Sequence, residues 1–194
     1  MYESSKSARR RYYDGNFITK YFVGNGLDVG CGPDPIWQYH AMFPMITSMR
    51  SWDMQDGDAQ YLESVDDDTF DFLHASHSLE HMQDPRVALT NWISVVKPGG
   101  YLILTVPDED LYEHGFWPSR FTNEHFWSFT IYKEASSMPQ SINVVDLVKE
   151  YADSVVCEKI ELINDFYRYD LPNDRDQTLT PNAECAIEII LKKR

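Results

Sequence analysis

The sequence has little of what marks membrane, nucleic-acid-binding or disulfide-stabilised proteins. None of its apolar runs approaches the roughly eighteen residues that cross a bilayer, and its basic N-terminus has no apolar stretch behind it. The three cysteines, Cys31, Cys157 and Cys185, form no short zinc-binding or redox spacing. Lys and Arg number 17 against 31 Asp and Glu, and the net charge of -14 opposes binding to a phosphate backbone. We therefore expect a cytoplasmic protein with free thiols and with neither membrane nor nucleic acid as a partner.

Short β-rich runs alternate with helical patterns along the 194 residues, with no internal repeat and no linker. This alternation indicates one α/β domain with a mostly parallel sheet. The clearest helix begins after the N-cap residue Asp84, with Pro85 in the first position, and is ended by residues 97–100. A second helix is expected at 142–151, and the last two strands are expected to form an antiparallel pair. The expected strands are residues 26–30, 46–53, 70–76, 101–107, 155–163 and 186–191.

A glycine turn follows the first expected strand. Gly30 and Gly32 stand where the strand must turn sharply into a helix, so a bare main chain can approach a nucleotide-like ligand closely. A dinucleotide site would have a third glycine where this chain has Pro35, which disfavours a nicotinamide or flavin enzyme. Asp53 ends the second strand, where a carboxylate can accept hydrogen bonds from the ribose hydroxyls of an adenosine. The alternative for Asp53 is an ordinary turn aspartate.

Five segments, taken in order, resemble the class I S-adenosylmethionine-dependent methyltransferases, in particular their small-molecule, type 11-like branch. These segments are residues 26–32, Asp53, residues 57–59, residues 70–81 and residues 97–103. The resemblance implies a Rossmann-like sheet, S-adenosylmethionine as cofactor and S-adenosylhomocysteine as product. Gly57 follows Asp53 too closely for the family's usual third strand and the helix before it, so this part of the sheet is expected to be shortened.

The resemblance also assigns residues around the cofactor. Asp28, Gly30 and Gly32 would line the methionine part of the cofactor, and Asp53 would hold its ribose. Asp58 and Ala59 would contact the adenine. Ser76 and His77 would lie near the sulfur that carries the methyl group.

The resemblance divides the single domain, residues 1–194, into four parts. They are an N-terminal helical cover at 1–24, a cofactor-binding half at 25–107, a cap over the acceptor site at 108–140, and a C-terminal helix with a strand pair at 141–194.

The acceptor is expected beyond the carboxyl ends of the strands, near residues 76–81 and from residue 107 onward. The acidic stretch 107–114 either takes part there or is a solvated loop, and the aromatic stretch 116–129 is expected to pack as a cap. Arg9, Arg10 and Arg11 form either a helix over the same opening or, as we favour, a solvated basic face.

A hydroxyl or protonated amine acceptor also needs a general base, and histidine has the ordinary pKa nearest neutrality. The candidates are His77, which its motif favours, and then His114 and His125. The expected reaction is methyl transfer to an oxygen or nitrogen of a small soluble molecule, of the sugar or secondary-metabolite type. The main alternative is a protein that binds S-adenosylmethionine without catalysis.

A second alternative is a zinc-dependent hydrolase, because His77, Glu80 and His81 match the pattern H-x-x-E-H. That chemistry requires a continuous helix, whereas this motif follows a strand directly and precedes the helix start at Asp84-Pro85. No metal site is therefore expected, and His81 is expected to serve as a structural hydrogen-bonding residue.

Overall fold

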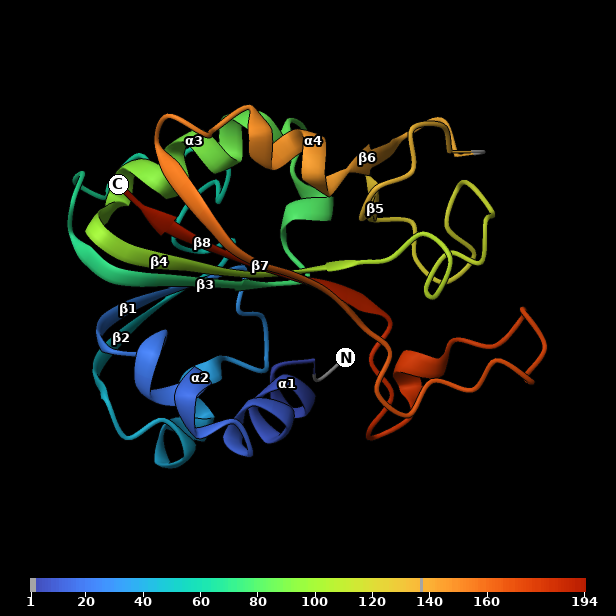
Figure 1. The fold of residues 1–194 in the computed structure, drawn as a ribbon, viewed down its shortest axis with the longest axis horizontal. Coiled ribbons are helices and arrows are strands. Elements are labelled where there is room, and N and C mark those ends of the chain that lie inside the picture. The colour runs from blue at the N-terminus through green and yellow to red at the C-terminus, as the bar shows by residue number, and fades with distance from the viewer. Residues whose placement is uncertain (1–2, 137) are drawn as a thin grey trace.

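The computed structural model describes residues 3–136 and 138–194, and its centre is a six-stranded sheet in the order β2-β1-β3-β4-β8-β7 (Figure 1). The first four strands of this order are parallel, and β8 is antiparallel to both β4 and β7. The strands are β1 (Gly24–Val29), β2 (Ile46–Trp52), β3 (Phe70–Ser76), β4 (Val96–Pro107), β7 (Val155–Ile163) and β8 (Ala186–Lys193), with a separate short parallel pair, β5 (Ser128–Thr130) and β6 (Ser141–Asn143). The predicted Rossmann-like, mostly parallel α/β sheet with a C-terminal antiparallel pair is confirmed.

Most predicted strands lie where the pattern placed them. Residues 53–69, all of them described, form neither helix nor strand between β2 and β3, so the third-strand region is indeed shortened. The exception is the start of β4, because residues 97–100 continue the strand rather than form a turn between helix and strand. The helix before it ends at Val95 and passes straight into extended backbone at Val96.

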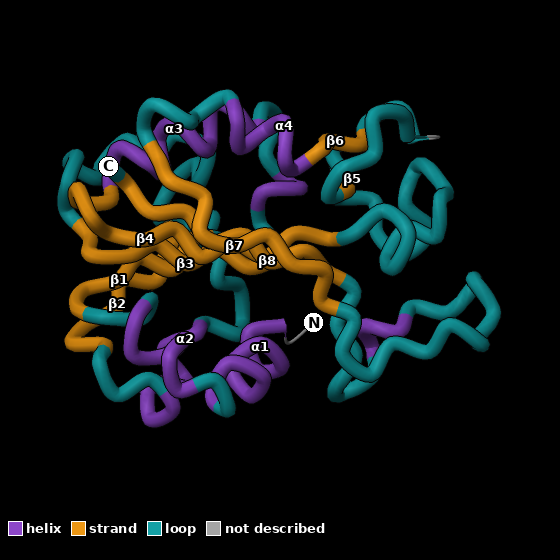
Figure 2. Tube along the Cα trace, viewed as in Figure 1, coloured by secondary structure: helices purple, strands orange, loops and turns teal. Residues whose placement is uncertain are grey.

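Helices cover both faces of the sheet (Figures 1 and 2). On one face lie α3 (Pro85–Val95) and α4 (Val144–Lys149), and on the other α1 (Glu3–Tyr12) and α2 (Gly15–Lys20). The carboxylate of Asp84 accepts hydrogen bonds from the first turn of α3. Short 3-10 turns complete the set: η1 (Ile36–Met42), η2 (Leu79–His81) and η3 (Gln177–Leu179).

Each face of the sheet has its own apolar core, because side chains alternate along a strand. On β4, Leu102 and Leu104 belong to the cluster that includes Trp92 of α3 and Leu147 of α4. Ile103 between them belongs to the cluster of α1, α2 and η1. The carboxyl ends of the parallel strands β1, β2, β3 and β4 lie at one edge of the sheet between these two cores.

The prediction that Arg9 to Arg11 form a solvated basic face is wrong for Arg11. Arg11 is 1% exposed, and its guanidinium donates to Glu188 Oε2 on β8 at 2.7 Å and to Thr105 Oγ1 on β4 at 3.2 Å. Arg10 is half-buried against the same glutamate, and only Arg9 is exposed. A helix that packs on a sheet turns one side inward. In α1 this inward side includes Arg11, because its partner Glu188 is itself buried on the sheet.

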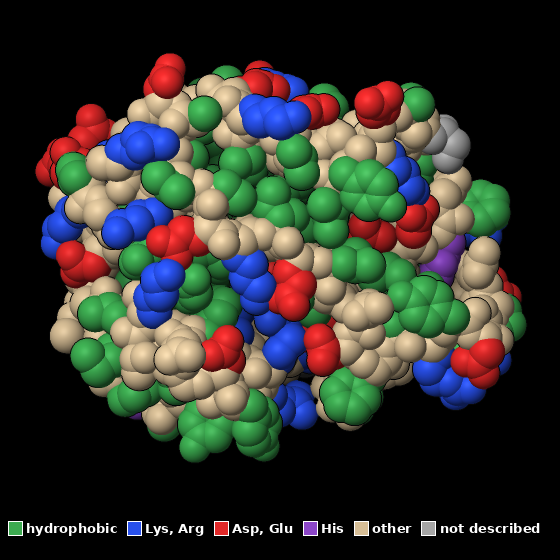
Figure 3. Space-filling view, viewed as in Figure 1, with side chains coloured by type: hydrophobic (Ala, Val, Ile, Leu, Met, Phe, Trp, Pro, Cys, Tyr) green, Lys and Arg blue, Asp and Glu red, His purple; other side chains and the backbone are tan. Residues whose placement is uncertain are grey.

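Charge is mixed on the surface despite the acidic composition. On the face drawn in Figure 3, basic and acidic side chains are interspersed among apolar ones. No helix in the described ranges is long and apolar enough to cross a bilayer. Of the predicted parts, 1–24 and 108–140 include residues 1, 2 and 137, which lie outside the described residues.

Candidate active site

The glycine turn lies where the strand order reverses. The chain leaves β1 for β2 on one side, while β3 and β4 lie on the other, and ligands of open α/β sheets bind at such a point. Gly30 N donates to Trp52 O at 2.8 Å, so the turn is joined to the end of β2. Gly30 has φ +66°, and a Cβ there would lie 2.3 Å from Ser78 Oγ. Only glycine fits between the end of β2 and the segment after β3.

Asp28 shapes this turn from within the sheet. It is buried on β1, its Oδ1 accepts from His74 Nδ1 at 2.7 Å, and its Oδ2 accepts from Ile36 N at 2.8 Å. Both oxygens are therefore engaged by the protein. Gly32, with φ +51°, has open space where a Cβ would be, so the main chain is accessible at that position. Gly32 borders open space, Gly30 packs against Ser78, and Asp28 is bonded both to β3 and to the far end of the turn.

Asp53 lies directly after β2, beside the glycine turn. Its carboxylate is partly exposed and accepts from Met54 N at 2.9 Å, while its own amide donates to Asp56 at 2.9 Å. Burial raises the pKa of the Cys31 thiol in the turn to about 11, and the carboxylates of Asp28 and Asp53 add to this effect. The turn is thus an electronegative place, suited to a ligand that carries hydroxyl donors or positive charge.

The predicted adenine residues continue the same loop. Asp58 is exposed and accepts from Gln60 N at 2.8 Å. The Ala59 carbonyl accepts from Trp92 Nε1 of α3 at 2.8 Å, and its side chain packs against the main core. These bonds hold residues 57–60 against α3, next to the end of β2.

Ser76 is the last residue of β3, and His77 follows it. Ser76 Oγ is buried and has no hydrogen-bond partner among the described residues, a rare condition that a bound ligand atom would relieve. His77 has φ +52°, and its amide donates to Thr105 O at 2.9 Å. Burial lowers the pKa of His77, but Glu80, Glu3 and Glu184 outweigh it, and the result lies above the ordinary value. An open main chain at Gly32, a carboxylate at Asp53 and an unpartnered hydroxyl at Ser76 are chemically suited to an adenosine-containing cofactor.

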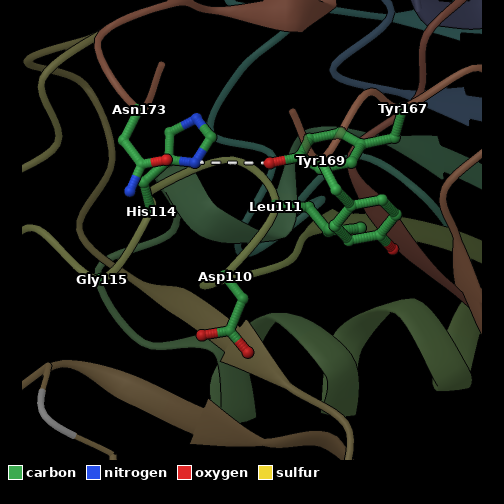
Figure 4. Close-up of a pocket in the computed structure, with 7 residues that line it drawn as sticks. All are labelled: Asp110, Leu111, His114, Gly115, Tyr167, Tyr169 and Asn173. Atoms are coloured by element: carbon green, nitrogen blue, oxygen red, sulfur yellow. Dashed lines mark hydrogen bonds between the residues drawn. The ribbon is translucent and has the colours of Figure 1, made fainter. Parts of the chain in front are cut away.

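The three candidate bases lie in two places. His77 and His125 both face Glu80, with His77 Nδ1 at 3.4 Å and His125 Nε2 at 3.8 Å from Glu80 Oε1. His114 lies apart, with Nδ1 3.4 Å from the hydroxyl of Tyr167. It lines a cavity of about 310 Å³ between the loop after β4 and the loop before η3, together with Asp110, Leu111, Gly115, Tyr167, Tyr169 and Asn173 (Figure 4).

The acidic stretch after β4 is not a solvated loop. Asp108, Glu109 and Glu113 are buried, and only Asp110 of its four carboxylates is exposed. Burial raises the pKa of Asp108 to about 6, although the amides of Leu111 and Asp110 act in the opposite direction. Sequence patterns missed the pairing of Glu113 with His125, because neither residue belongs to a motif and no local spacing links them.

The aromatic stretch is a cap only in part. Phe129 is fully buried in the main core, and Trp127 packs against it. Phe116 and Phe126 are exposed, and the Arg120 guanidinium lies over the Phe116 ring at 3.1 Å.

The family follows from a sequence model described as a methyltransferase domain, which matches residues 9–138, more than half of the chain. The chain belongs to this methyltransferase family. The predicted S-adenosylmethionine-dependent methyltransferase is therefore confirmed, with S-adenosylmethionine as its cofactor. No curated protein sequence matches this methyltransferase significantly.

Solved structures share the fold of this methyltransferase at low sequence identity. A SAM-dependent methyltransferase from Archaeoglobus fulgidus is 18% identical with a TM-score of 0.61, over 100% of this chain and 95% of that one. The N-methyltransferase NodS from Bradyrhizobium japonicum, solved with S-adenosylhomocysteine, is 12% identical with a TM-score of 0.56, over 95% and 86%. A Haloferax volcanii methyltransferase in complex with the activator Trm112 is 14% identical with a TM-score of 0.55, over 99% and 98%.

Proposed function

We propose that this methyltransferase moves the methyl group of S-adenosylmethionine to an oxygen or nitrogen of a small soluble acceptor and releases S-adenosylhomocysteine. The observation that carries the proposal is the meeting of three strand ends: the glycine turn after β1, Asp53 after β2 and Ser76 at the end of β3. Gly30 N donates to the carbonyl of Trp52, the last residue of β2, and Ser78 Oγ, just past the end of β3, donates to Val29 O at 2.8 Å.

Each side chain has a role that follows from its chemistry. The bare main chain at Gly30 and Gly32 admits the methionine part of the cofactor, and Asp53 accepts hydrogen bonds from the ribose hydroxyls. Asp58 and Ala59 border the adenine. Asp28, whose oxygens are engaged by His74 and Ile36, acts by holding the turn.

The sulfonium of the bound cofactor supplies an already activated methyl group, so the protein mainly aligns a nucleophile in line with it. The acceptor atom forms a bond to the methyl carbon as the carbon–sulfur bond breaks, and the acceptor's proton leaves to a base. His77 is our first choice for that base, because it directly follows Ser76. His125 and His114 are the other candidates; His114 lines a separate cavity, and only an acceptor reaching that cavity would involve it.

We further propose a cytoplasmic protein without a membrane partner. We also propose that it does not bind nucleic acid, because its net charge of -14 opposes approach to a phosphate backbone. The competing function is binding of S-adenosylmethionine without transfer, since the identity of the base rests on position alone. The hydrolase alternative is disfavoured because Leu79 to His81 form a single 3-10 turn rather than a continuous α-helix.

The test is to incubate the purified protein with methyl-labelled S-adenosylmethionine and a fractionated cell extract, and to follow the label. Label in a small molecule, together with S-adenosylhomocysteine, is the expected result. Binding of the cofactor without label transfer from any fraction would favour the binding protein, and failure to bind the cofactor would overturn the proposal.

A further inference from the structure

Glu80 is a buried carboxylate that accepts no hydrogen bond in the described part of the protein. Its side chain is 0% exposed, and neither carboxylate oxygen has a hydrogen-bond partner among the described residues. Three histidine nitrogens approach Oε1 without bonding it: His77 Nδ1 at 3.4 Å, His125 Nε2 at 3.8 Å and His81 Nε2 at 3.9 Å. The positively charged groups near this buried carboxylate are imidazoles, which can lose their charge, and none is in hydrogen-bond geometry, so a metal ion would be a fitting additional partner.

Two of these histidines are oriented by hydrogen bonds at their other nitrogen. His81 Nδ1 lies 2.9 Å from the carbonyl oxygen of Glu124, and His125 Nδ1 lies 2.9 Å from Glu113 Oε1. Both acceptors require the proton on Nδ1, which leaves the lone pair on Nε2, the nitrogen that faces Glu80. Metal-bound histidines are held in this way by a carboxylate or a backbone carbonyl.

The backbone brings these side chains together. The amides of Phe126 and Trp127 both donate to the carbonyl of Glu80, at 2.9 and 3.2 Å, and so hold the segment that carries His125 against the turn η2. Glu113, which orients His125, is also fully buried, and its second oxygen has no bonding partner in the described part of the chain.

We propose that Glu80 Oε1, His81 Nε2 and His125 Nε2 bind a divalent transition-metal ion of the zinc type. The donor atoms all lie within 4.8 Å of one another. Tetrahedral zinc with bonds near 2.0–2.1 Å has ligands about 3.4 Å apart. The separations of 3.8 and 3.9 Å from Glu80 Oε1 would then contract by about half an ångström, and the two histidine nitrogens, at most 4.8 Å apart, by up to about 1.4 Å. Two imidazoles and one carboxylate form a donor set suited to zinc, and the cation would offset the buried charge of Glu80.

This ligand set differs from the one that the H-x-x-E-H motif suggested, and it departs from our expectation that the protein has no metal site. The H-x-x-E-H pattern would use His77 and His81 as ligands and Glu80 as the base. In the proposed site Glu80 is itself a ligand, and His125, from a distant segment, takes the place of His77.

Three protein ligands leave a coordination position for water or for an oxygen of the acceptor. An acceptor hydroxyl bound there would lose its proton more readily, since a cation lowers the pKa of a bound hydroxyl. This role, unlike the binding site itself, rests on the proposed function.

The site is tested first on the purified full-length protein by metal analysis and by titration of the metal-free protein with Co²⁺. We expect one equivalent of metal and visible absorption bands of four- or five-coordinate Co²⁺. His125→Ala should abolish the bands, whereas the exposed His40→Ala, the matched control, should leave them unchanged. No bands in the wild type, or bands that persist in His125→Ala, would overturn the proposal.

Two further measurements do not depend on how His125→Ala folds. Bound Cu²⁺ in the wild type should show coupling to imidazole nitrogens by electron paramagnetic resonance, and its absence would count against the site. Glu113→Gln should weaken Co²⁺ binding by about 10- to 100-fold, because it removes the carboxylate that orients His125. Full methyl transfer by metal-free protein would overturn the role in acceptor activation, whereas failure of transfer with metal bound would count against the proposed function.

Discussion

Two buried polar clusters lie near the glycine turn, and they differ in how completely the protein satisfies them. In the first, Arg11 and Glu188 form an ion pair at 2.7 Å, and Arg11 Nη1 also lies 3.1 Å from His74 Nε2. His74 in turn bonds Asp28, so the chain of contacts runs from helix α1 to the glycine turn. In the second, the carboxylate of Glu80 is surrounded by histidines but bonded by none.

The comparison separates a structural device from a candidate binding site. Arginine carries a permanent charge, and its close bonds to Glu188 fasten α1 to the sheet. Histidines can lose their charge, and of those around Glu80 only His77, whose pKa burial lowers but the carboxylate raises, comes as near as 3.4 Å. Breaking a closely bonded buried charge pair destabilises the fold, whereas a buried carboxylate that accepts no hydrogen bond is available to a ligand.

The largest effect is expected from breaking the satisfied cluster. Arg11→Met removes the most deeply buried cation paired with Glu188, while Arg10 and Lys159 stay at 3.1 and 3.0 Å. The cost should therefore lie at the lower end of the range for a broken buried ion pair, about 3 kcal/mol of the free energy of unfolding, measured with urea at neutral pH. Arg9→Ala, on the exposed side of the same helix, is the control and should change it by less than about 0.5 kcal/mol. A loss in Arg11→Met no larger than in the control would contradict the structural role.

The sign of the pH dependence follows from Glu188. Burial raises the pKa of this carboxylate, but Arg11 and Arg10 hold it well below its usual range. Its contribution to stability is therefore present above the ordinary glutamate pKa and is lost as the pH falls toward the folded-state pKa. The difference between Arg11→Met and the wild type should shrink over the same acidic range.

Asp108 is an intermediate case, a buried carboxylate bonded by backbone amides but without a close cation. Its folded pKa of about 6 lies above its unfolded value, so stability decreases as the pH rises through that window. Asp108→Asn keeps the oxygen that accepts from Asp110 N and Leu111 N. It should raise the free energy of unfolding at pH 8 by about 1–3 kcal/mol and change it little at pH 4. Equal effects at the two pH values would contradict the assignment.

The proposed contact with the ribose of the cofactor is tested at Asp53. Asp53→Ala should weaken S-adenosylmethionine binding at least about tenfold by calorimetry, because the hydrogen bonds to the ribose, worth about 1.5–3 kcal/mol, are lost. Asp67→Ala, a substitution of another exposed loop aspartate, should leave the affinity unchanged. Unchanged affinity in both variants would mean that the ribose lies elsewhere.

The smallest effect is expected from the unsatisfied cluster. In metal-free protein, Glu80→Gln should change the free energy of unfolding by less than about 1 kcal/mol, since no hydrogen bond to the carboxylate is lost and His77 can release its proton. Thermal unfolding of Glu80→Gln and Arg11→Met, measured side by side, compares the two losses of stability directly. A loss as large as that of Arg11→Met would make Glu80 a structural anchor and remove the distinction between the clusters.

Elements with strong local signals were predictable. The apolar run 70–76 became β3 with the expected bounds, and the Asp84 cap with Pro85 starts α3. The resemblance likewise anticipated the missing third strand. The site was predictable only where it depends on strand ends, as for Gly30, Asp53 and Ser76, because chain order determines which strand ends meet at the switch point. Their roles toward the cofactor stay predictions.

The sequence by itself determined the fold class and the place of the glycine turn, since these depend on periodicity and spacing within short segments, and it indicated the family through motifs that resemble it. Only the tertiary structure decided that Arg11 is buried, that the acidic stretch after β4 faces inward, and that His125 lies beside Glu80 and His81. Such contacts join segments far apart in the chain, Arg11 and Glu188 being 177 residues apart. Burial and charge pairing at that range depend on how whole layers pack, which no local pattern encodes.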